Sequence, residues 1–171
     1  LGLKGTMSEA ELHMLRARLI GGRMNKARRG ELKCGLPVGF VYDGDRVVLD
    51  PDQQVRRTLR LFFETFERTG SCFSTVRYFR TSKILFPRKM RSGPSKGALL
   101  WSPLDHSTGL HVLHNPRYAG AFAFGRSRWR KNANGRPSTR KLPREEWFAL
   151  HRDVHEGYIT WQQYETNQER L

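Results

Sequence analysis

The sequence predicts an α+β fold that is mostly helical, with a helix-turn-helix-like core, small β-hairpins and a long connecting helix at its start. Three observations predict this fold. Apolar residues recur at helical spacing behind capping signals, as they do after Ser71 and Thr160. Short strand-like runs flank an Asp-Gly pair and, later, a basic tip. The 171 residues are 37% hydrophobic, which is enough for one sizeable domain or two small ones.

The first predicted helix covers residues 8–30. Ser8 to Glu11 are typical of a capping box, and Leu12, Leu15 and Leu19 then follow at helical spacing. The helix leads into a basic arm made of Arg28, Arg29 and Lys33. Two interpretations stay open. The segment is either a connecting helix whose arm meets a polyanion, or a core helix whose cations complement its dipole.

A hairpin and two helices come next. The run LPVGFVYDGDRVVLD, residues 36–50, predicts a hairpin with a type I′ turn at Asp43-Gly44. Asp50 as N-cap, with Pro51 behind it, predicts a helix that ends at Gly70. Ser71 caps a shorter helix over residues 71–82. The inward faces of these helices are predicted to hold Val55, Leu59, Phe62, Phe66, Phe73, Val76 and Phe79.

Residues 86–100, FPRKMRSGPSKGALL, are rich in Pro, Gly, Ser and basic side chains, which indicates a flexible loop. A helix is then predicted with Ser102 as N-cap, Pro103 at its first position and Asp105 at its third. Asn115-Pro116 ends it.

A strand over residues 118–124, a basic tip and a return strand near 147–151 follow. Thr160 and Gln163 form a last capping box, which predicts a helix that continues to the end of the chain.

The charge is concentrated in one third of the chain. Residues 86–141 hold 12 Lys/Arg and one acid, Asp105, for a net +11. The other 115 residues hold 19 basic and 15 acidic side chains, for a net +4, so that the chain totals +15. Charge of this sign and density favours a polyanionic partner, most often nucleic acid. No apolar run approaches the ~18 residues of a membrane span, and no membrane partner is expected.

The predicted helix-turn-helix suggests which residues meet double-stranded DNA. The second helix of such a motif enters the major groove, and short polar side chains allow close approach to base edges. Long cations on the basic tip suit phosphates or the minor groove. The candidate DNA-binding residues are Arg28, Arg29, Lys33, Arg88, Lys89, Arg91, Lys96, Ser102, Asp105, His106, Ser107, Thr108, His111, Arg117, Arg126, Arg128, Arg130, Lys131, Arg136 and Arg140.

Signals for catalysis or cofactors are weak. His111 and His114 could share a helix face and bind a metal, but no carboxylate or cysteine nearby completes a site, so surface histidines are the preferred interpretation. Cys34 and Cys72 are 38 residues apart without a CxxC pattern, which favours two reduced thiols. We expect no catalytic residue, no metal and no cofactor in this chain.

Three motifs in order resemble the recombinase domain of large serine recombinases, the phage integrases, transposases and invertases. They are KARRGELKCGLPVGFVYDGDRVVLDPDQQV (residues 26–55), FFETFERTGSCFSTVRYF (62–79) and HVLHNPRYAGAFAFGR (111–126). One departure is Gly109, where the family usually has an aliphatic residue. Glycine there costs ~1 kcal/mol of helix stability, or it allows close approach to DNA.

The resemblance implies a division of the chain. Residues 1–30 would be the end of a catalytic domain and its connecting helix, residues 31–160 the DNA-binding domain, and residues 161–171 the start of a linker toward a further C-terminal domain. In the family, the catalytic serine precedes this region and a four-cysteine zinc ribbon follows it, so the chain is expected to be an inactive fragment. It also implies a bacterial or phage-encoded cytoplasmic protein that self-associates as a dimer or tetramer in its full-length form.

We therefore expect one function, and two alternatives to it remain open. The expected function is recognition of an attachment-site half by a site-specific recombinase. The first alternative is a helix-turn-helix regulator with no recombinase activity. The second alternative is a nuclease that uses its histidines.

Overall fold

The computed structural model describes residues 9–90, 93–94, 97–131 and 134–171. Five α-helices and several two-stranded sheets in these residues confirm the predicted α+β class. Ser8, Arg91 and Lys96, which the sequence singled out, lie outside the described residues. The chain divides into two compact units, one from residues 1–33 and 124–149 and the other from residues 34–123 and 150–171.

The first unit begins with the predicted connecting helix, α1 (Glu9–Arg28). Its single buried residue is Ala27. Leu12, Leu15 and Leu19 are all exposed, Leu19 by 61%. These leucines therefore form no core in the described structure, and the role of α1 as a connecting helix stays a prediction.

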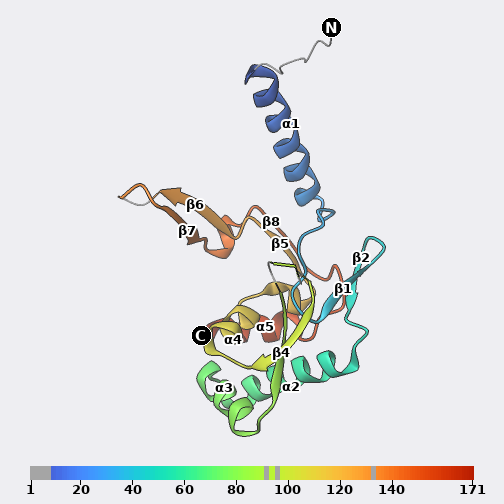
Figure 1. The fold of residues 1–171 in the computed structure, drawn as a ribbon, viewed down its shortest axis with the longest axis vertical. Helices are drawn as coiled ribbons and strands as arrows, with labels where there is room; N and C mark the ends of the chain where they lie inside the picture. The colour runs from blue at the N-terminus through green and yellow to red at the C-terminus, as the bar shows by residue number, and fades with distance from the viewer. Residues whose placement is uncertain (1–8, 91–92, 95–96, 132–133) are drawn as a thin grey trace. The chain divides into compact units, whose positions relative to one another are not determined.

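A basic hairpin forms the rest of this unit. Strands β6 (Ser127–Lys131) and β7 (Pro137–Lys141) pair antiparallel, and Figure 1 shows them as a two-stranded ribbon. A short 3₁₀ turn, η2 (Arg144–Glu146), follows.

The predicted strand over residues 118–124 was wrong in its first half, because residues Pro116–Ala119 form a 3₁₀ helix, η1. Only β5 (Phe122–Phe124) is extended, and it pairs with β8 (Ala149–His151), close to the predicted return strand.

The second unit opens with the predicted hairpin, β1 (Phe40–Asp43) and β2 (Arg46–Leu49). Its turn is one residue later than predicted, because Asp43 pairs with Arg46 and leaves Gly44 and Asp45 as the loop. Gly44 has φ +58°, a conformation that favours glycine.

Helix α2 (Gln53–Thr69) starts at Asp52 rather than at the predicted Asp50. The Asp52 carboxylate accepts from the Gln54 amide at 2.7 Å, while Asp50 accepts from the Asp52 amide and so holds the turn before the helix. Gly70 ends the helix in the left-handed conformation, as predicted.

Helix α3 (Cys72–Thr81) begins at the predicted N-cap, Ser71. Val76 and Phe79 are buried as expected, but Phe73 is 66% exposed and its predicted inward position was wrong. Position 72 takes the inward place instead, because Cys72 is buried on the same face as Val76.

The predicted flexible loop over residues 86–100 was also wrong at both ends. Strands β3 (Leu85–Lys89) and β4 (Leu99–Pro103) form a hairpin in which Phe86 pairs with Ser102. Ser102 and Pro103 therefore lie in a strand and do not start a helix. Helix α4 (His106–Leu113) begins after Asp105, which is its N-cap and not its third residue.

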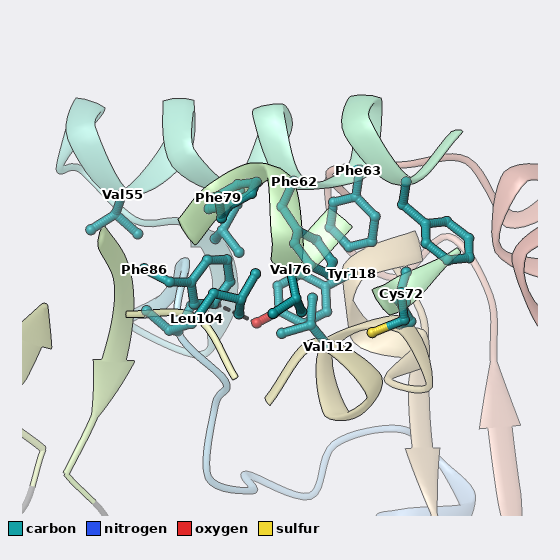
Figure 2. Packing of buried hydrophobic residues seen from close by; sticks show 14 of the residues in the cluster. Val55, Phe62, Phe63, Cys72, Val76, Phe79, Phe86, Leu104, Val112 and Tyr118 are labelled. Atoms are coloured by element: carbon teal, nitrogen blue, oxygen red, sulfur yellow. Dashed lines mark hydrogen bonds between the residues drawn. The ribbon is translucent and has the colours of Figure 1, made fainter. Parts of the chain in front are cut away.

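Side chains from α2, α3, β3 and α4 meet in one core (Figure 2). The rings of Phe62 and Phe86 lie 5.5 Å apart, and those of Phe62 and Phe79 lie 6.0 Å apart. Tyr118 is 1% exposed, and its hydroxyl donates to the Val38 carbonyl at 2.9 Å. This hydrogen bond joins η1 to the segment before β1, and burial raises the pKa of Tyr118.

Helix α5 (Trp161–Glu169) begins with the predicted capping box of Thr160 and Gln163. Within the second unit, α5 packs through Tyr164, which is 2% exposed, and through Gln168. The Gln168 amide donates to the Leu113 carbonyl at 2.9 Å, and its oxygen lies 2.7 Å from Nδ1 of His114. Across the described part of the chain, none of the helices has the length and apolarity needed to cross a bilayer.

Candidate nucleic-acid interface

Asp105 fixes the first turn of α4. Its carboxylate accepts from the Thr108 amide at 2.7 Å, from the Thr108 hydroxyl at 2.9 Å, and from Nη1 of Arg88 at 3.2 Å. The hydrogen bonds from Thr108, followed by the charge of Arg88, hold the pKa of Asp105 below its usual value. Asp105, which was predicted to contact DNA, therefore uses its carboxylate to cap α4. Its contact with Arg88 also links β3 to α4.

One face of α4 belongs to the core. Val112 and Leu113 are buried, and a Cβ at Gly109 would lie 2.8 Å from Sγ of Cys72 and 3.7 Å from the ring of Phe62. Gly109 therefore lets α4 approach α3 closely. The idea that this glycine makes room for DNA is wrong, because the glycine faces inward.

The opposite face of α4 is polar and open. Ser107 and His111 are exposed on this face, and Thr108 is half-buried. His106 is exposed at the first position of the helix, three residues before Gly109 and so nearer the inward side. Ser107 and His111 are four residues apart, so they lie about 6 Å from each other along the helix axis. None of the three exposed side chains is needed for the core, which leaves short hydrogen-bonding groups available on a rigid helix.

Arg80 is a positioning residue that sequence analysis missed. Its Nε donates to the Leu104 carbonyl at 3.1 Å, which ties α3 to the segment just before α4. Leu104 itself is 1% exposed. No sequence signal identifies this contact, because an arginine in the last turn of a helix is ordinarily solvated.

Three of the predicted DNA-contact residues have polar groups that are enclosed by the protein itself. Arg117 is 7% exposed, with its guanidinium 5.7 Å from the centroid of the Phe122 ring, and burial lowers its pKa. Lys89 Nζ donates to the Phe40 carbonyl at 2.7 Å. Ser102 Oγ is buried without a hydrogen-bond partner. We leave these three out of the proposed interface because their polar groups face the protein interior.

In the first unit, the basic hairpin exposes every residue of both strands. Its exposed candidates are Arg128, Arg130, Lys131, Arg136 and Arg140. No Asp or Glu occurs from residue 126 to residue 141. The hairpin is thus a strongly cationic surface with no acidic side chain of its own.

The root of the hairpin is held by aromatic contacts. The Arg126 guanidinium lies 5.6 Å from the centroid of the Trp147 ring, and Trp147 Nε1 donates to the Leu142 carbonyl at 3.0 Å. The Arg28 guanidinium, at the end of α1, lies 5.3 Å from the centroid of the Phe148 ring. Two of the predicted DNA-binding arginines therefore also stack on the root.

The remaining arm residues are exposed after α1. Arg29 pairs with Glu31 at 2.8 Å, and this hydrogen bond lowers the pKa of Glu31. Lys33 is exposed. The structure thus brings Arg28, Arg29 and Lys33 into one unit with the hairpin, and places Arg88 and the α4 residues in the other.

Metal and thiol chemistry find little support in the described residues. Within them, no group of three His, Cys, Asp or Glu side chains could hold a metal ion. Cys34 and Cys72 are free thiols, and burial raises the pKa of Cys72 to about 11.

Comparison with known proteins decides the family. The sequence model of the Recombinase family matches residues 53–171, from α2 to α5. The chain belongs to the Recombinase family. The family predicted from the three motifs is therefore confirmed, and the recombinase match covers α3, α4 and the basic hairpin alike.

Relatives of this recombinase domain were found in both sequence and structure. A curated protein of Sinorhizobium fredii, "Uncharacterized protein y4bA/y4pH", is 58% identical over 172 residues, covering 100% of this chain and 25% of that protein. The chain thus spans a quarter of the length of this relative.

Two solved structures share the fold. One is described as the crystal structure of an LSR–DNA complex, with a TM-score of 0.54 and 14% identity, covering 90% of this chain and 38% of that one. The other concerns the sequence requirements of the Listeria innocua prophage attP site, with a TM-score of 0.53 and 14% identity, covering 90% of this chain and 50% of that one.

Proposed function

We propose that this recombinase domain binds double-stranded DNA and recognises one half of an attachment site. The observation that carries the proposal is the concentration of charge: a net +11 over residues 86–141, with the hairpin cations exposed and the polar face of α4 free of the core. A surface of this kind neutralises phosphates and releases their counterions, which drives duplex binding.

In this proposal, helix and hairpin have different roles. His106, Ser107 and His111 present short donors and acceptors that fit against base edges in the major groove. The hairpin presents long cations that suit phosphates, which position a protein without reading sequence. That a solved relative in fold is an LSR–DNA complex supports the same interpretation.

The proposal extends to the whole protein. A serine nucleophile in a preceding domain would cut and rejoin DNA, self-association would bring two sites together, and this domain would choose the site.

Selection of binding sequences from random duplexes tests the division of roles. The chain is compared with a helix variant, His106→Ala with Ser107→Ala, and a hairpin variant, Arg128→Ala with Arg130→Ala. The helix variant is expected to change the selected sequence, at ~1–3 kcal/mol for each specific hydrogen bond to a base that the substitutions remove.

The hairpin variant should weaken binding to all sequences alike and leave the selected sequence as it was. If the hairpin variant changes the selected sequence and the helix variant does not, the two roles have been assigned the wrong way round. No selected sequence with any of the proteins would contradict site recognition.

A further inference from the structure

The strand register divides the basic hairpin into two chemically different faces. Residues directly opposite each other share a face, and successive residues alternate between faces. Arg128 pairs with Arg140 and Arg130 pairs with Ser138, so three arginines lie on one face. We call Arg128, Arg130 and Arg140 the arginine face.

The other face has a different composition. Trp129 pairs with Thr139 at its centre, between the Ser127–Lys141 pair and the Lys131–Pro137 pair. Trp129 is 60% exposed. An aromatic residue opposite a β-branched one stabilises a two-stranded hairpin, so Trp129 has a structural role that needs no ligand.

Charge is dense on the arginine face and sparse on the other. Directly opposite residues have Cα atoms about 5 Å apart, and alternate residues along a strand are about 7 Å apart. The three arginines are thus attached close together on one face of the ribbon. Lys131 and Lys141 are attached at opposite ends of the hairpin, about 13 Å from each other along the strand direction.

The pairing of Arg128 with Arg140 is unfavourable in the free chain. Like charges directly opposite each other in a sheet repel, and no carboxylate of the hairpin compensates them. An anion between them removes this repulsion. Guanidinium groups also bind phosphate oxygens through two parallel hydrogen bonds, which an ammonium group does not do.

We propose that the arginine face is a one-sided phosphate-binding surface, and that the hairpin lies on the DNA backbone with Arg128, Arg130 and Arg140 toward it and Trp129 away from it. The inference rests on the proposed function, since it requires that the chain bind duplex DNA. The fixed root, with Arg126 stacked on Trp147, would hold the hairpin in this orientation.

Two double variants with the same charge change test the proposal. Arg128→Ala with Arg140→Ala removes two of the three arginines of the arginine face. Lys131→Ala with Lys141→Ala removes two cations from the opposite face, which the proposal takes out of the DNA contact although Lys131 was a candidate DNA-binding residue. Binding of the 171-residue chain to a random-sequence duplex is measured by fluorescence anisotropy over a salt series. A third variant, Arg128→Lys with Arg140→Lys, keeps the charge and removes the paired hydrogen bonds.

The arginine double should reduce the magnitude of the salt slope by about 1.8, because two phosphates are no longer neutralised, and weaken binding by at least roughly tenfold. The lysine double should change the slope by less than about 0.5. The Arg→Lys double should keep the slope close to that of the starting chain and still bind more weakly, because it retains charge without the guanidinium fork. Thermal unfolding serves as the folding control, and removal of the Arg128–Arg140 repulsion should leave the Tm unchanged or raised.

Equal losses of affinity in the arginine and lysine doubles would overturn the one-sided surface while leaving DNA binding by the chain in place. So would a larger loss in the lysine double. If the unsubstituted chain does not bind duplex DNA at all, the proposed function fails as well.

Discussion

A Cβ atom at position 109 would lie 2.8 Å from Sγ of Cys72, so Gly109 marks the place where α4 meets α3. The contact places the polar face of α4 outward, since the glycine is on the side that faces the core. The same contact leads to a double-mutant test.

Gly109→Ala should destabilise the chain by about 1–2 kcal/mol, because overpacking against Cys72 outweighs the ~1 kcal/mol that alanine gains in helix propensity. Adding Cys72→Ala should recover much of that stability, since it removes the atom in the way. Urea unfolding of the four proteins in the cycle measures the coupling. A stabilised Gly109→Ala chain with no coupling to Cys72 would show that the two helices are not in contact there.

Asp105 should stabilise α4 as a cap more than as a charge. Asp105→Ala is expected to cost about 1–2 kcal/mol in the free energy of unfolding, and Asp105→Asn clearly less, because asparagine also caps. Since the pKa of Asp105 is lowered in the folded chain, its contribution is present above the unfolded pKa and is lost as pH falls through the folded one. Unfolding between pH 7 and pH 3 checks both points, and equal destabilisation in the two variants would assign the effect to the Arg88 ion pair.

His155 should make the chain less stable in mild acid. Burial, then the charge of Arg117, lowers the pKa of His155, while the carbonyl of Glu156 beside Nδ1 acts in the opposite sense. The unfolded chain therefore binds this proton first, so stability is complete above the unfolded pKa of about 6.5 and declines as pH falls below it. His155→Phe should flatten the unfolding free energy between pH 7.5 and pH 5.5. An equally steep decline in that variant would assign the effect to other histidines.

Leu19 should be almost neutral for stability. It is 61% exposed on α1, so Leu19→Ala is expected to change the unfolding free energy by less than about 0.5 kcal/mol. Phe62→Ala, in the core, should cost about 3–5 kcal/mol and serves as the comparison. A destabilisation above about 1.5 kcal/mol at Leu19 would mean that α1 is packed against something in solution.

Elements with local signals could be predicted from the sequence. Ser71, Gly70 and the Thr160–Gln163 capping box act through their nearest backbone neighbours, so their positions follow from residue type alone. The N-cap of α2 was predicted at Asp50 but lies at Asp52. Two nearby carboxylates offer the same capping chemistry, and the local turn decides which of them caps the helix.

The missed elements depend on tertiary contacts. Strand β3 contains Pro87 and is followed by Gly and Ser, which indicates a loop until Phe86 is seen to enter the core. Ser102 and Pro103 are residue types that commonly begin a helix, although here they belong to β4. The inward direction of Gly109 also could not be read from the sequence, because a glycine carries no hydrophobic signal for a helix face.

Of the candidate interface, the exposed cations from Arg128 to Arg140 follow from composition, since a segment without acids and with few apolar residues stays on the surface. Arg117 could not be assigned correctly in this way. Its burial over Phe122 arises from the turn of η1 into β5, which no local pattern encodes.

The most direct test of DNA binding by this domain is the salt dependence of the affinity of the unsubstituted chain for a DNA duplex. If the +11 segment neutralises about six phosphates, the logarithm of the binding constant should fall against the logarithm of salt concentration with a slope of about −5. A slope shallower than about −2, or no duplex binding at low salt, would contradict a charge-driven DNA-binding domain.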